Sequence, residues 1–386
     1  MSGRAQRGKG SERATRCTRR RVLELGLAPL ALLACRPPPP RSRSTRAELT
    51  FEPLRLRLRH TWTIARGSAS EKVNGLLSLT AEGVTGWGEA AFATRHGQSF
   101  ASAQRAFPTL SRAVAECDPW APRRWLEAAE GTVGAQTGLC AALDAALWDW
   151  RGKRLGQPLH RLLGTRGDRV PPTSFSIAID DPERMAERAR EAVGYPVLKL
   201  KVGLGDDRRR VLAVRAAVPG RPLRVDANEG WRDLPLAREM IAWLAGQGVE
   251  LVEQPLPAGQ EARMRELRDA SPLPLVADES VQRSADLPRV VGGYHGVNVK
   301  LAKCGGVTRA LEMITRARSL GLKVMLGCMI ESSLGIAAAL ALAPLADWVD
   351  LDGNLLLDED PFVGLAIEGG RWRLPSAPGL GVRRRS

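Results

Sequence analysis

The sequence lacks the residue patterns of several common protein chemistries. It has six cysteines, but no two have the C-x-x-C spacing of a zinc site, so we expect free thiols rather than a metal–thiolate centre. It has four histidines, and neither a Ser/His/Asp hydrolase pattern nor a glycine-rich phosphate loop occurs. These absences leave carboxylates and lysines as the candidate chemical groups.

The sequence also lacks a basic stripe with interleaved aromatic residues, although its formal net charge is +15. Residues 1–46 hold 12 basic and two acidic side chains, so ten of the fifteen net charges lie in this segment. The remainder of the chain is nearly balanced. We therefore expect no nucleic-acid partner.

Residues 1–46 predict an export leader followed by a tether. Arg19-Arg20-Arg21 resembles a twin-arginine signal, and the apolar stretch from Leu25 to Ala34 is too short to span a bilayer. Leu32-Leu33-Ala34-Cys35 resembles the site where bacterial lipoproteins are cleaved and lipidated. We expect an exported protein, periplasmic or anchored to a membrane through Cys35. If translation starts after this leader, the expected location is cytoplasmic.

Residues 47–171 predict an α+β capping domain. Apolar alternation over residues 49–59 and strand-like runs over 74–81 and 85–91 predict three strands, the last two joined by a turn at Glu82-Gly83. The polar, glycine-bearing segment from Trp62 to Lys72 predicts a loop between the first two strands. Helical periodicity then follows in three segments, residues 99–116, 122–130 and 136–154.

Residues 172–358 predict the α/β part of the chain. Eight short apolar runs read as strands, and a helical segment follows each of the first seven. This order predicts a (β/α)7β barrel of the TIM type, with the preceding α+β domain as its cap. Residues 359–386 are expected to return to the cap.

Charged residues close five of these strands at nearly constant intervals of 25, 27, 25 and 22 positions: Lys201, Asp226, Glu253, Asp278 and Lys300. The carboxyl ends of barrel strands meet at one rim, which is where barrel enzymes place their active sites. Capping of a helix could explain one of the acids, but not three in register. Carboxylate oxygens suit Mg²⁺, so the three acids predict a magnesium site.

The lysines predict the reaction. Lys199 and Lys201 share a strand face, and we expect Lys199 to support Lys201 as a catalytic base. Lys300 lies across the ring, so two bases can remove a proton from one face of a carbon and return one to the other. This is racemisation or epimerisation. Lys303 is the alternative to Lys300, but it begins the loop after the strand.

Three polar residues follow the metal-ligand positions and are expected to orient those ligands: Asn228, Gln254 and Glu279.

Five motifs together resemble the muconate-lactonizing subgroup of the enolase superfamily: Lys199-x-Lys201, Asp226-x-Asn228, Glu253-Gln254-Pro255, Asp278-Glu279-Ser280 and Asn298-x-Lys300. Asp350-x-Asp352, at the eighth strand, resembles the signature of the dipeptide epimerases. The resemblance runs from about residue 49 to residue 374. It implies one Mg²⁺ per subunit, an enediolate intermediate stabilised by that metal, and a free substrate ammonium group bound by the aspartate pair.

The resemblance also implies how a substrate side chain is recognised. In the family, a mobile loop of the cap closes over the site, and His60–Glu71 is the matching segment here. Arg66 is expected to pair with a glutamyl carboxylate, unless it is only an exposed loop arginine. Ser174, on the first barrel strand, is expected to line the pocket.

The resulting hypothesis is an isomerase that inverts the Cα of the C-terminal residue of a dipeptide such as L-Ala-L/D-Glu. The alternatives in the same subgroup are a cycloisomerase, an o-succinylbenzoate synthase and an N-acylamino-acid racemase. A tethered binding protein without catalysis is the alternative from another class. We also expect a homo-oligomer, whose order the sequence does not determine.

Overall fold

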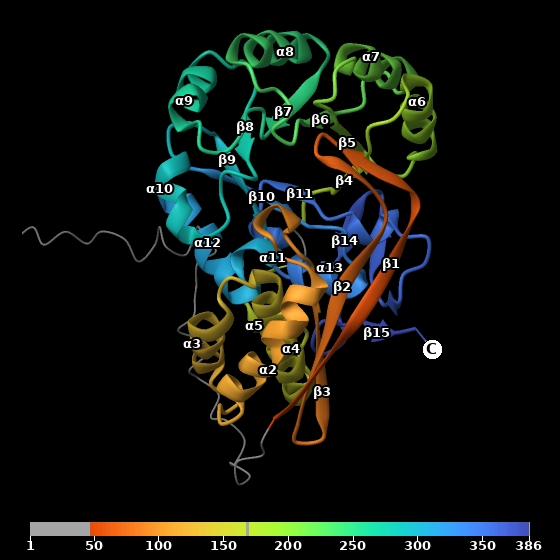
Figure 1. Ribbon diagram of the computed structural model, residues 1–386. Coiled ribbons are helices and arrows are strands. Elements are labelled where there is room, and N and C mark those ends of the chain that lie inside the picture. Colours follow the sequence, from red (N-terminus) through yellow and green to blue (C-terminus); the bar gives the residue numbers. More distant parts are fainter. Residues whose placement is uncertain (1–46, 167–169, 386) are drawn as a thin grey trace, which may run out of the picture. The chain divides into compact units, whose positions relative to one another are not determined.

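The computed structural model describes residues 47–166 and 170–385 (Figure 1). The predicted leader, with its arginine run and Cys35, lies outside these residues. Within them, no helix has the length and apolar character needed to cross a membrane. The cysteines in the described ranges are free thiols, as expected: Cys117, Cys140, Cys304 and Cys328.

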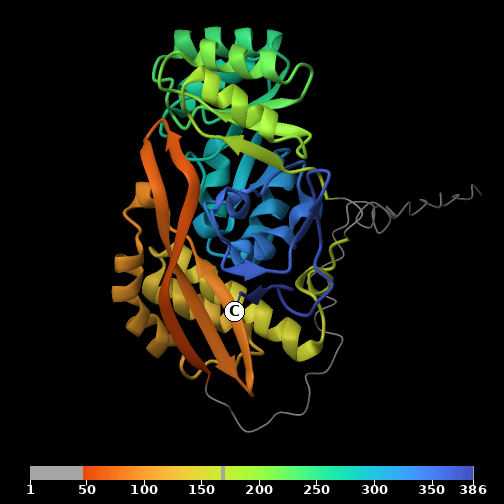
Figure 2. The same cartoon turned by 90° about the vertical axis from the view of Figure 1, so that its right-hand side faces the viewer.

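The cap begins with an antiparallel sheet in the order β1-β2-β3, formed by β1 (Glu48–Ile64), β2 (Gly67–Ala81) and β3 (Val84–Ala90). Its helices are α2 (Phe100–Val114), α3 (Pro122–Val133), α4 (Thr137–Leu155) and the short α5 (Leu159–Leu162). Helix α4 packs directly on β3 (Figure 2). A side chain at Gly88 would overlap the Ala142 carbonyl of α4, so this close packing requires glycine.

The prediction of a loop over residues 62–72 is wrong. The two strands continue as a hairpin, with Trp62 opposite Ala69 and Ile64 opposite Gly67, which leaves Ala65 and Arg66 as the turn. From residue 58 to 72, buried and exposed side chains do not alternate strictly. The sequence therefore lacks the apolar–polar alternation by which a half-buried strand is predicted. The tip reaches the barrel, where Ile179 donates its backbone N–H to the Thr63 carbonyl, 2.9 Å away.

The second domain contains eight parallel strands in the order β11-β10-β9-β8-β7-β6-β5-β4. A parallel bridge between Thr173 and Val349 brings the two ends of this sheet together, which confirms the predicted barrel. The strands are β4 (Ser174–Ile177), β5 (Val197–Lys201), β6 (Leu223–Asp226), β7 (Val249–Glu253), β8 (Leu275–Ala277), β9 (Gly296–Lys300), β10 (Lys323–Gly327) and β11 (Trp348–Asp350).

Helices follow the barrel strands, as predicted. They are α6 (Pro182–Glu191), α7 (Asp207–Ala217), α8 (Leu234–Gly246), α9 (Glu261–Asp269), α10 (Leu287–Val290), α11 (Leu301–Cys304), α12 (Val307–Ser319) and α13 (Ser333–Leu340). Two helices follow β9, because the short α11 comes before α12.

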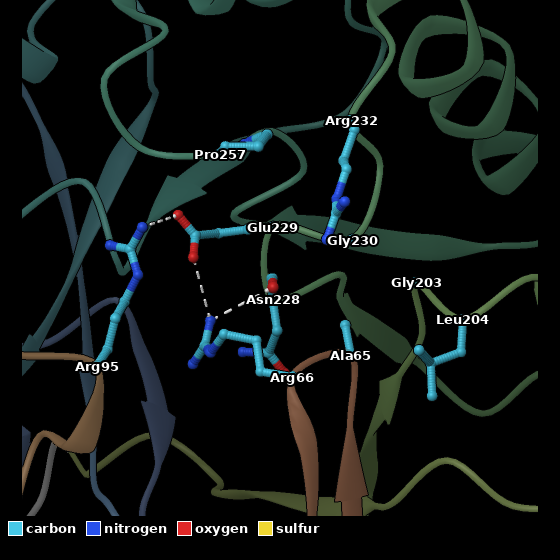
Figure 3. A pocket seen from close by; sticks show the side chains of 10 residues that line it. All are labelled: Ala65, Arg66, Arg95, Gly203, Leu204, Asn228, Glu229, Gly230, Arg232 and Pro257. Atoms are coloured by element: carbon cyan, nitrogen blue, oxygen red, sulfur yellow. Dashed lines mark hydrogen bonds and ion pairs between the residues drawn. The ribbon is translucent and has the colours of Figure 1, made fainter.

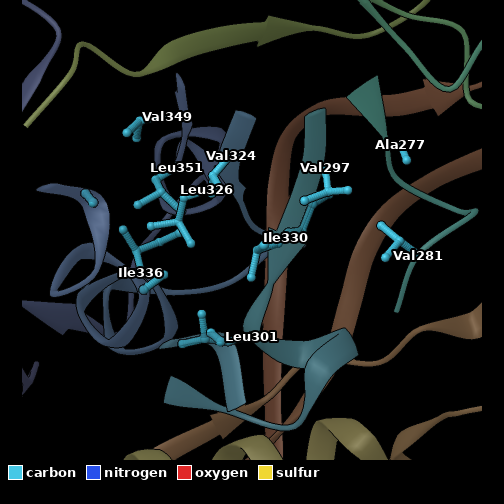
Figure 4. Close-up of a cluster of buried hydrophobic side chains, with 14 of the residues drawn as sticks. Ala277, Val281, Val297, Leu301, Val324, Leu326, Ile330, Ile336, Val349 and Leu351 are labelled. Atoms are coloured by element: carbon cyan, nitrogen blue, oxygen red, sulfur yellow. The ribbon is translucent and has the colours of Figure 1, made fainter. Parts of the chain in front are cut away.

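Strand alternation separates the core of the barrel from its chemistry. Leu198 and Leu200 of β5 are fully buried with the aliphatic cluster, while Lys199 and Lys201 occupy the other face of the strand. Figure 4 shows part of this cluster, with Leu326 and Ile336 among its labelled members. Apolar packing on one face therefore holds the charged residues on the other.

The end of the chain forms two small two-stranded sheets, β12 (Phe362–Val363) with β15 (Arg383–Arg384), and β13 (Ala366–Glu368) with β14 (Arg371–Arg373). In the segment that joins β14 to β15, the Gly379 carbonyl accepts a hydrogen bond from the Leu159 N–H of α5 at 2.8 Å. Leu380 donates its N–H to Asp149 of α4, also at 2.8 Å. The C-terminal segment thus contacts two helices of the cap.

Candidate active site

The register of the strands brings the predicted charged residues to one rim of the barrel. Lys201 pairs in register with Asp226, and Asp226 with Glu253. Gly327 of β10 lies between Lys300 on one side and Asp350 on the other. Each charged residue stands at the carboxyl end of its strand, and each is buried.

Lys199 connects the metal-ligand positions to the aspartate pair of the eighth strand. Its ammonium group lies 2.6 Å from Glu253 Oε2, 2.6 Å from Asp350 Oδ2 and 3.3 Å from Asp226 Oδ2. Burial alone would lower the pKa of Lys199, but these three carboxylates raise it well above its ordinary value. A permanently charged Lys199 offsets the repulsion among the acids.

Lys201 forms an ion pair with Asp226, with Nζ 2.6 Å from Oδ2. The ring of Trp62, near the hairpin tip, has its centroid 5.9 Å from the same ammonium group. Burial raises the pKa of Asp226, but Lys201 and Lys199 outweigh it and lower this pKa to about 2. Asp226 is therefore an anion over the whole physiological range.

Asp278 is shared by two lysines. Lys300 Nζ lies 3.0 Å from its Oδ2, and Lys303 Nζ contacts its Oδ1 and its backbone carbonyl, the latter at 2.7 Å. Despite burial, the two cations hold the pKa of Asp278 well below its usual range. Assigning Lys303 to a loop missed this contact. Lys303 lies in the short helix α11, which begins directly after Lys300 and returns the Lys303 ammonium group to Asp278.

The three carboxylates fit a divalent cation by their chemistry. Glu253 and Asp226 both contact the Lys199 ammonium group, at 2.6 and 3.3 Å. Burial and the negative charges of Asp226 and Asp278 raise the pKa of Glu253. Asn298 donates to Glu253 Oε1 at 2.7 Å, while Oε2 faces Lys199. In the described ranges, no three His, Cys, Asp or Glu side chains form a metal-binding cluster. Lysine ammonium groups contact Glu253, Asp226 and Asp278.

The residues that follow the carboxylates hold them in place. Gln254 Oε1 accepts the backbone N–H groups of Asp278 and Ser280, at 2.9 and 3.1 Å. Asn228 donates its backbone N–H to Asp226 Oδ1 at 2.9 Å. Asn228 and Gln254 have φ angles of 43° and 39°, a left-handed conformation that is costly outside glycine. Such strain at two neighbouring strand ends is typical of a functional site.

Arg66 reaches this rim from the turn of the cap hairpin. Its guanidinium contacts Glu279, and it lies 3.4 Å from Glu229 Oε2 and 3.3 Å from the Asn228 carbonyl. Arg95, in the short 3-10 helix Thr94–His96, pairs with Glu229 Oε1 at 2.7 Å. Arg66 is thus neither a free loop arginine nor an uncommitted partner for a substrate.

A cavity of about 600 Å³ opens beside Arg66 (Figure 3). Three guanidinium groups line it, those of Arg66, Arg95 and Arg232, against the single carboxylate of Glu229. The lining therefore has an excess of positive charge.

The aspartates of the eighth strand have unequal surroundings. Asp350 receives Lys199 at Oδ2 and the Ser174 hydroxyl at Oδ1, so Ser174 supports Asp350 directly. Asp352 accepts the Ser176 N–H at 2.6 Å, and no cationic side chain pairs with it in the part of the chain that the structure describes. Burial and the charge of Asp350 raise the pKa of Asp352 to about 6. A bound cation would therefore stabilise the charged form of Asp352 more than that of Asp350, which already pairs with Lys199.

The comparison with known protein families agrees with this arrangement. Residues 182–385 match the enolase C-terminal domain-like family. Residues 49–164 match the N-terminal domain of mandelate racemase and muconate lactonizing enzyme. The chain belongs to the enolase superfamily.

Two relatives with known activities are similar in sequence to this enolase-superfamily member over most of their length. It is 41% identical over 349 residues to an L-Ala-D/L-amino acid epimerase of Pedosphaera parvula, covering 88% of this chain and 99% of the relative. It is 37% identical over 338 residues to the L-Ala-D/L-Glu epimerase of Bacteroides thetaiotaomicron, covering 87% and 88%.

Solved structures agree in fold. A dipeptide epimerase from Cytophaga hutchinsonii, complexed with Mg and D-Ala-L-Val, superimposes with a TM-score of 0.84 at 26% identity, over 89% of this chain and 96% of that one. An N-succinyl Arg/Lys racemase from Bacillus cereus gives 0.84 at 30% identity, with the same coverage.

Proposed function

We propose that this protein is a Mg²⁺-dependent dipeptide epimerase that inverts the Cα of the C-terminal residue. The observation that carries the proposal is the combination of two lysines on opposite sides of the rim with an aspartate pair beside them. The lysines account for a proton transfer at one carbon, and the aspartates account for a substrate with a free amino terminus. The relatives named above act on substrates of this kind.

The order of the strands supports two-sided proton transfer. Lys201 ends β5 and Lys300 ends β9, four strands apart in a barrel of eight, so the two ammonium groups approach the centre from opposite sides. A neutral lysine on one side takes the Cα proton, and a protonated lysine on the other side delivers one. Each turnover leaves one proton transferred between the lysines, and exchange with solvent restores them.

Asp226, Glu253 and Asp278 would hold the Mg²⁺. When bound, the metal supplies positive charge beside the substrate carboxylate, which makes the neighbouring Cα proton easier to remove. Lys199 stays charged between Glu253 and Asp350 and keeps these carboxylates in position.

The substrate's two ends meet different charges. Its ammonium group would bind at Asp352, which is not paired with a cation in the described part of the chain. The cavity lined by Arg66, Arg95 and Arg232 supports an acidic side chain on the epimerised residue. Because Glu279 and Glu229 already contact Arg66, an incoming carboxylate shares that arginine rather than finding it free.

Incubation in deuterated water tests the proposal. L-Ala-L-Glu should gain one deuteron at the glutamyl Cα and become a mixture of epimers, measured by mass spectrometry and NMR. Omission of Mg²⁺ is the control and should stop the exchange. A panel of dipeptides that gains no deuterium on prolonged incubation with Mg²⁺ would show the proposal to be wrong.

The N-succinyl Arg/Lys racemase neighbour favours N-acylamino-acid racemisation as the second candidate. An N-acylated substrate carries no ammonium group, so its turnover should not depend on the charge of Asp352. The variant Asp352→Asn separates the two functions. Loss of exchange with a dipeptide supports epimerisation, whereas retained exchange with N-acyl amino acids supports the second candidate.

Export, lipidation at Cys35 and homo-oligomerisation are further proposals, and the first two rest on the motifs in residues 18–35. Palmitate labelling of the full chain should require Cys35, with Cys117→Ala as the matched control. Light scattering of the purified protein measures the assembly. Unlabelled, cytoplasmic protein would show the predicted location to be wrong.

A further inference from the structure

A buried carboxylate of the cap holds a barrel loop. Glu89, on β3, accepts the backbone N–H of Ser332 at 3.1 Å, that of Gly335 at 3.2 Å, and the Ser332 hydroxyl. These donors lie in the loop after β10 and in the first turn of α13, more than 240 residues further along the chain. Glu89 is buried and its partners are all N–H or O–H groups.

A second cap side chain supports the same loop. Asn74, on β2, donates its amide to Glu89 Oε1 at 2.7 Å and to the Ile330 carbonyl at 2.9 Å. Burial raises the pKa of Glu89, while the hydrogen bonds from Ser332 and Asn74 lower it. Two strands of the cap therefore hold the backbone from Ile330 to Gly335.

The other side of this loop rests on the aspartate pair. Cys328 donates its thiol to the Asp350 carbonyl, with sulfur and oxygen 3.4 Å apart. A side chain on Gly353, directly after Asp352, would overlap the Met329 carbonyl and lie 2.9 Å from Glu331 N. The loop thus packs against the backbone that carries Asp350 and Asp352, with no room for a Cβ between them.

We infer that Glu89 is a positioning residue for the ammonium site: from the cap, it fixes the loop on which the backbone of Asp350 and Asp352 rests. The inference rests on the proposed function only in taking these two aspartates as the ammonium site. It implies that substrate affinity depends on a carboxylate that touches neither substrate nor metal ligands.

Glu89→Gln is the test, because glutamine keeps the shape but turns an N–H toward the loop's own N–H donors. Asp144→Asn is the matched control. Asp144, on α4, is equally buried and accepts the N–H and hydroxyl of Thr308 of the barrel, both at 2.8 Å, far along the chain from the aspartate pair. Both variants weaken the contact between cap and barrel, but only the first displaces the loop.

We expect Glu89→Gln to raise the KM for a dipeptide by about tenfold with a smaller change in kcat, since small displacements of binding groups are costly. Asp144→Asn should leave KM within about twofold, even where it lowers the melting temperature equally. Equal KM values in the two variants would overturn the inference.

Hydrogen exchange gives a readout that needs no turnover. In Glu89→Gln, the amides of residues 349–354 should exchange faster than in wild type, while Asp144→Asn should leave them unchanged. Unchanged protection in Glu89→Gln overturns the inference even where no dipeptide is epimerised. Faster exchange without dipeptide turnover upholds the positioning and refutes the proposed function alone.

Discussion

The barrel rim and the junction between cap and barrel bury carboxylates by different means. At the rim, Asp226 and Asp278 face lysines, and their pKa values fall below the ordinary range. At the junction, Glu89 and Asp144 face N–H and hydroxyl groups. Burial raises the pKa of both, that of Asp144 to about 6.

The difference separates chemistry from architecture. An ion pair with a lysine can be exchanged for a metal ion or a substrate group, because the lysine retains its charge and can move. A carboxylate held by backbone N–H groups is fixed by the fold itself and serves to join two segments. Charged side chains that are equally buried can therefore have opposite roles.

The largest effect should come from removing a rim lysine. Lys201→Ala eliminates the base on one side of the substrate, and dipeptide epimerisation should fall by about a thousandfold or more. Lys323→Ala, at the opposite end of a barrel strand, is the matched control and should keep wild-type activity. Deuterium incorporation measures both. Near-normal epimerisation by Lys201→Ala would show that the rim lysines are not catalytic, and the contrast between the rim and the junction would then be wrong.

The variant Asp278→Asn should have the next largest effect. It leaves Lys300 and Lys303 buried without their carboxylate, so we expect a loss of about 3–5 kcal/mol in unfolding free energy. Mg²⁺ should raise the melting temperature of the wild type but not of this variant. Asp269→Asn, on the surface, should leave the Mg²⁺ response intact. A variant with the wild-type response to Mg²⁺ would argue against Asp278 as a ligand.

The junction should respond to pH through Glu331, whose pKa burial and the charge of Glu89 raise from 4.5 to about 8. Between these values the folded protein keeps a proton that the unfolded chain has lost, so stability falls as pH rises, by at most about 1.4 kcal/mol per pH unit. Glu331→Gln cannot titrate and should flatten this slope. Urea unfolding from pH 5 to 8 measures how the unfolding free energy depends on pH. Equal slopes in the wild type and in Glu331→Gln would contradict the assignment of this dependence to Glu331.

The smallest effect should come from a surface pair, which calibrates the comparison. Arg384 lies 3.0 Å from Glu52, and both side chains are about half exposed. Solvent screens this pair, so Arg384→Ala should change the unfolding free energy by less than about 0.5 kcal/mol. A larger loss in urea unfolding would show that burial is not what separates strong pairs from weak ones here.

The rim could be predicted because its signal is local and repeated. Each charged residue ends an apolar run, and the interval of about 25 residues matches one strand, one helix and their loops. Asp226 and Glu253 therefore lie in register, as the spacing required. Lys303 was assigned to a loop because the sequence does not show that α11 turns its ammonium group back to Asp278.

The cap hairpin and the junction gave no such signal. The hairpin tip packs only at its end, so its side chains do not alternate, and the sequence predicts a loop where strands pair. The contact of Glu89 with Ser332 joins residues 243 positions apart, and neither sequence segment indicates the other.

Sequence alone determined the barrel, its ring of lysines and acids, and the reaction these groups can perform, because periodic apolar runs and the charges that end them are local properties. Tertiary structure decided which partners those charges have. Arg66 pairs with Glu279, Lys199 joins Glu253 to Asp350, and only Asp352 of the aspartate pair has no cationic partner in the described part of the chain. The reason is that burial and charge pairing depend on distances between segments, which no local pattern encodes.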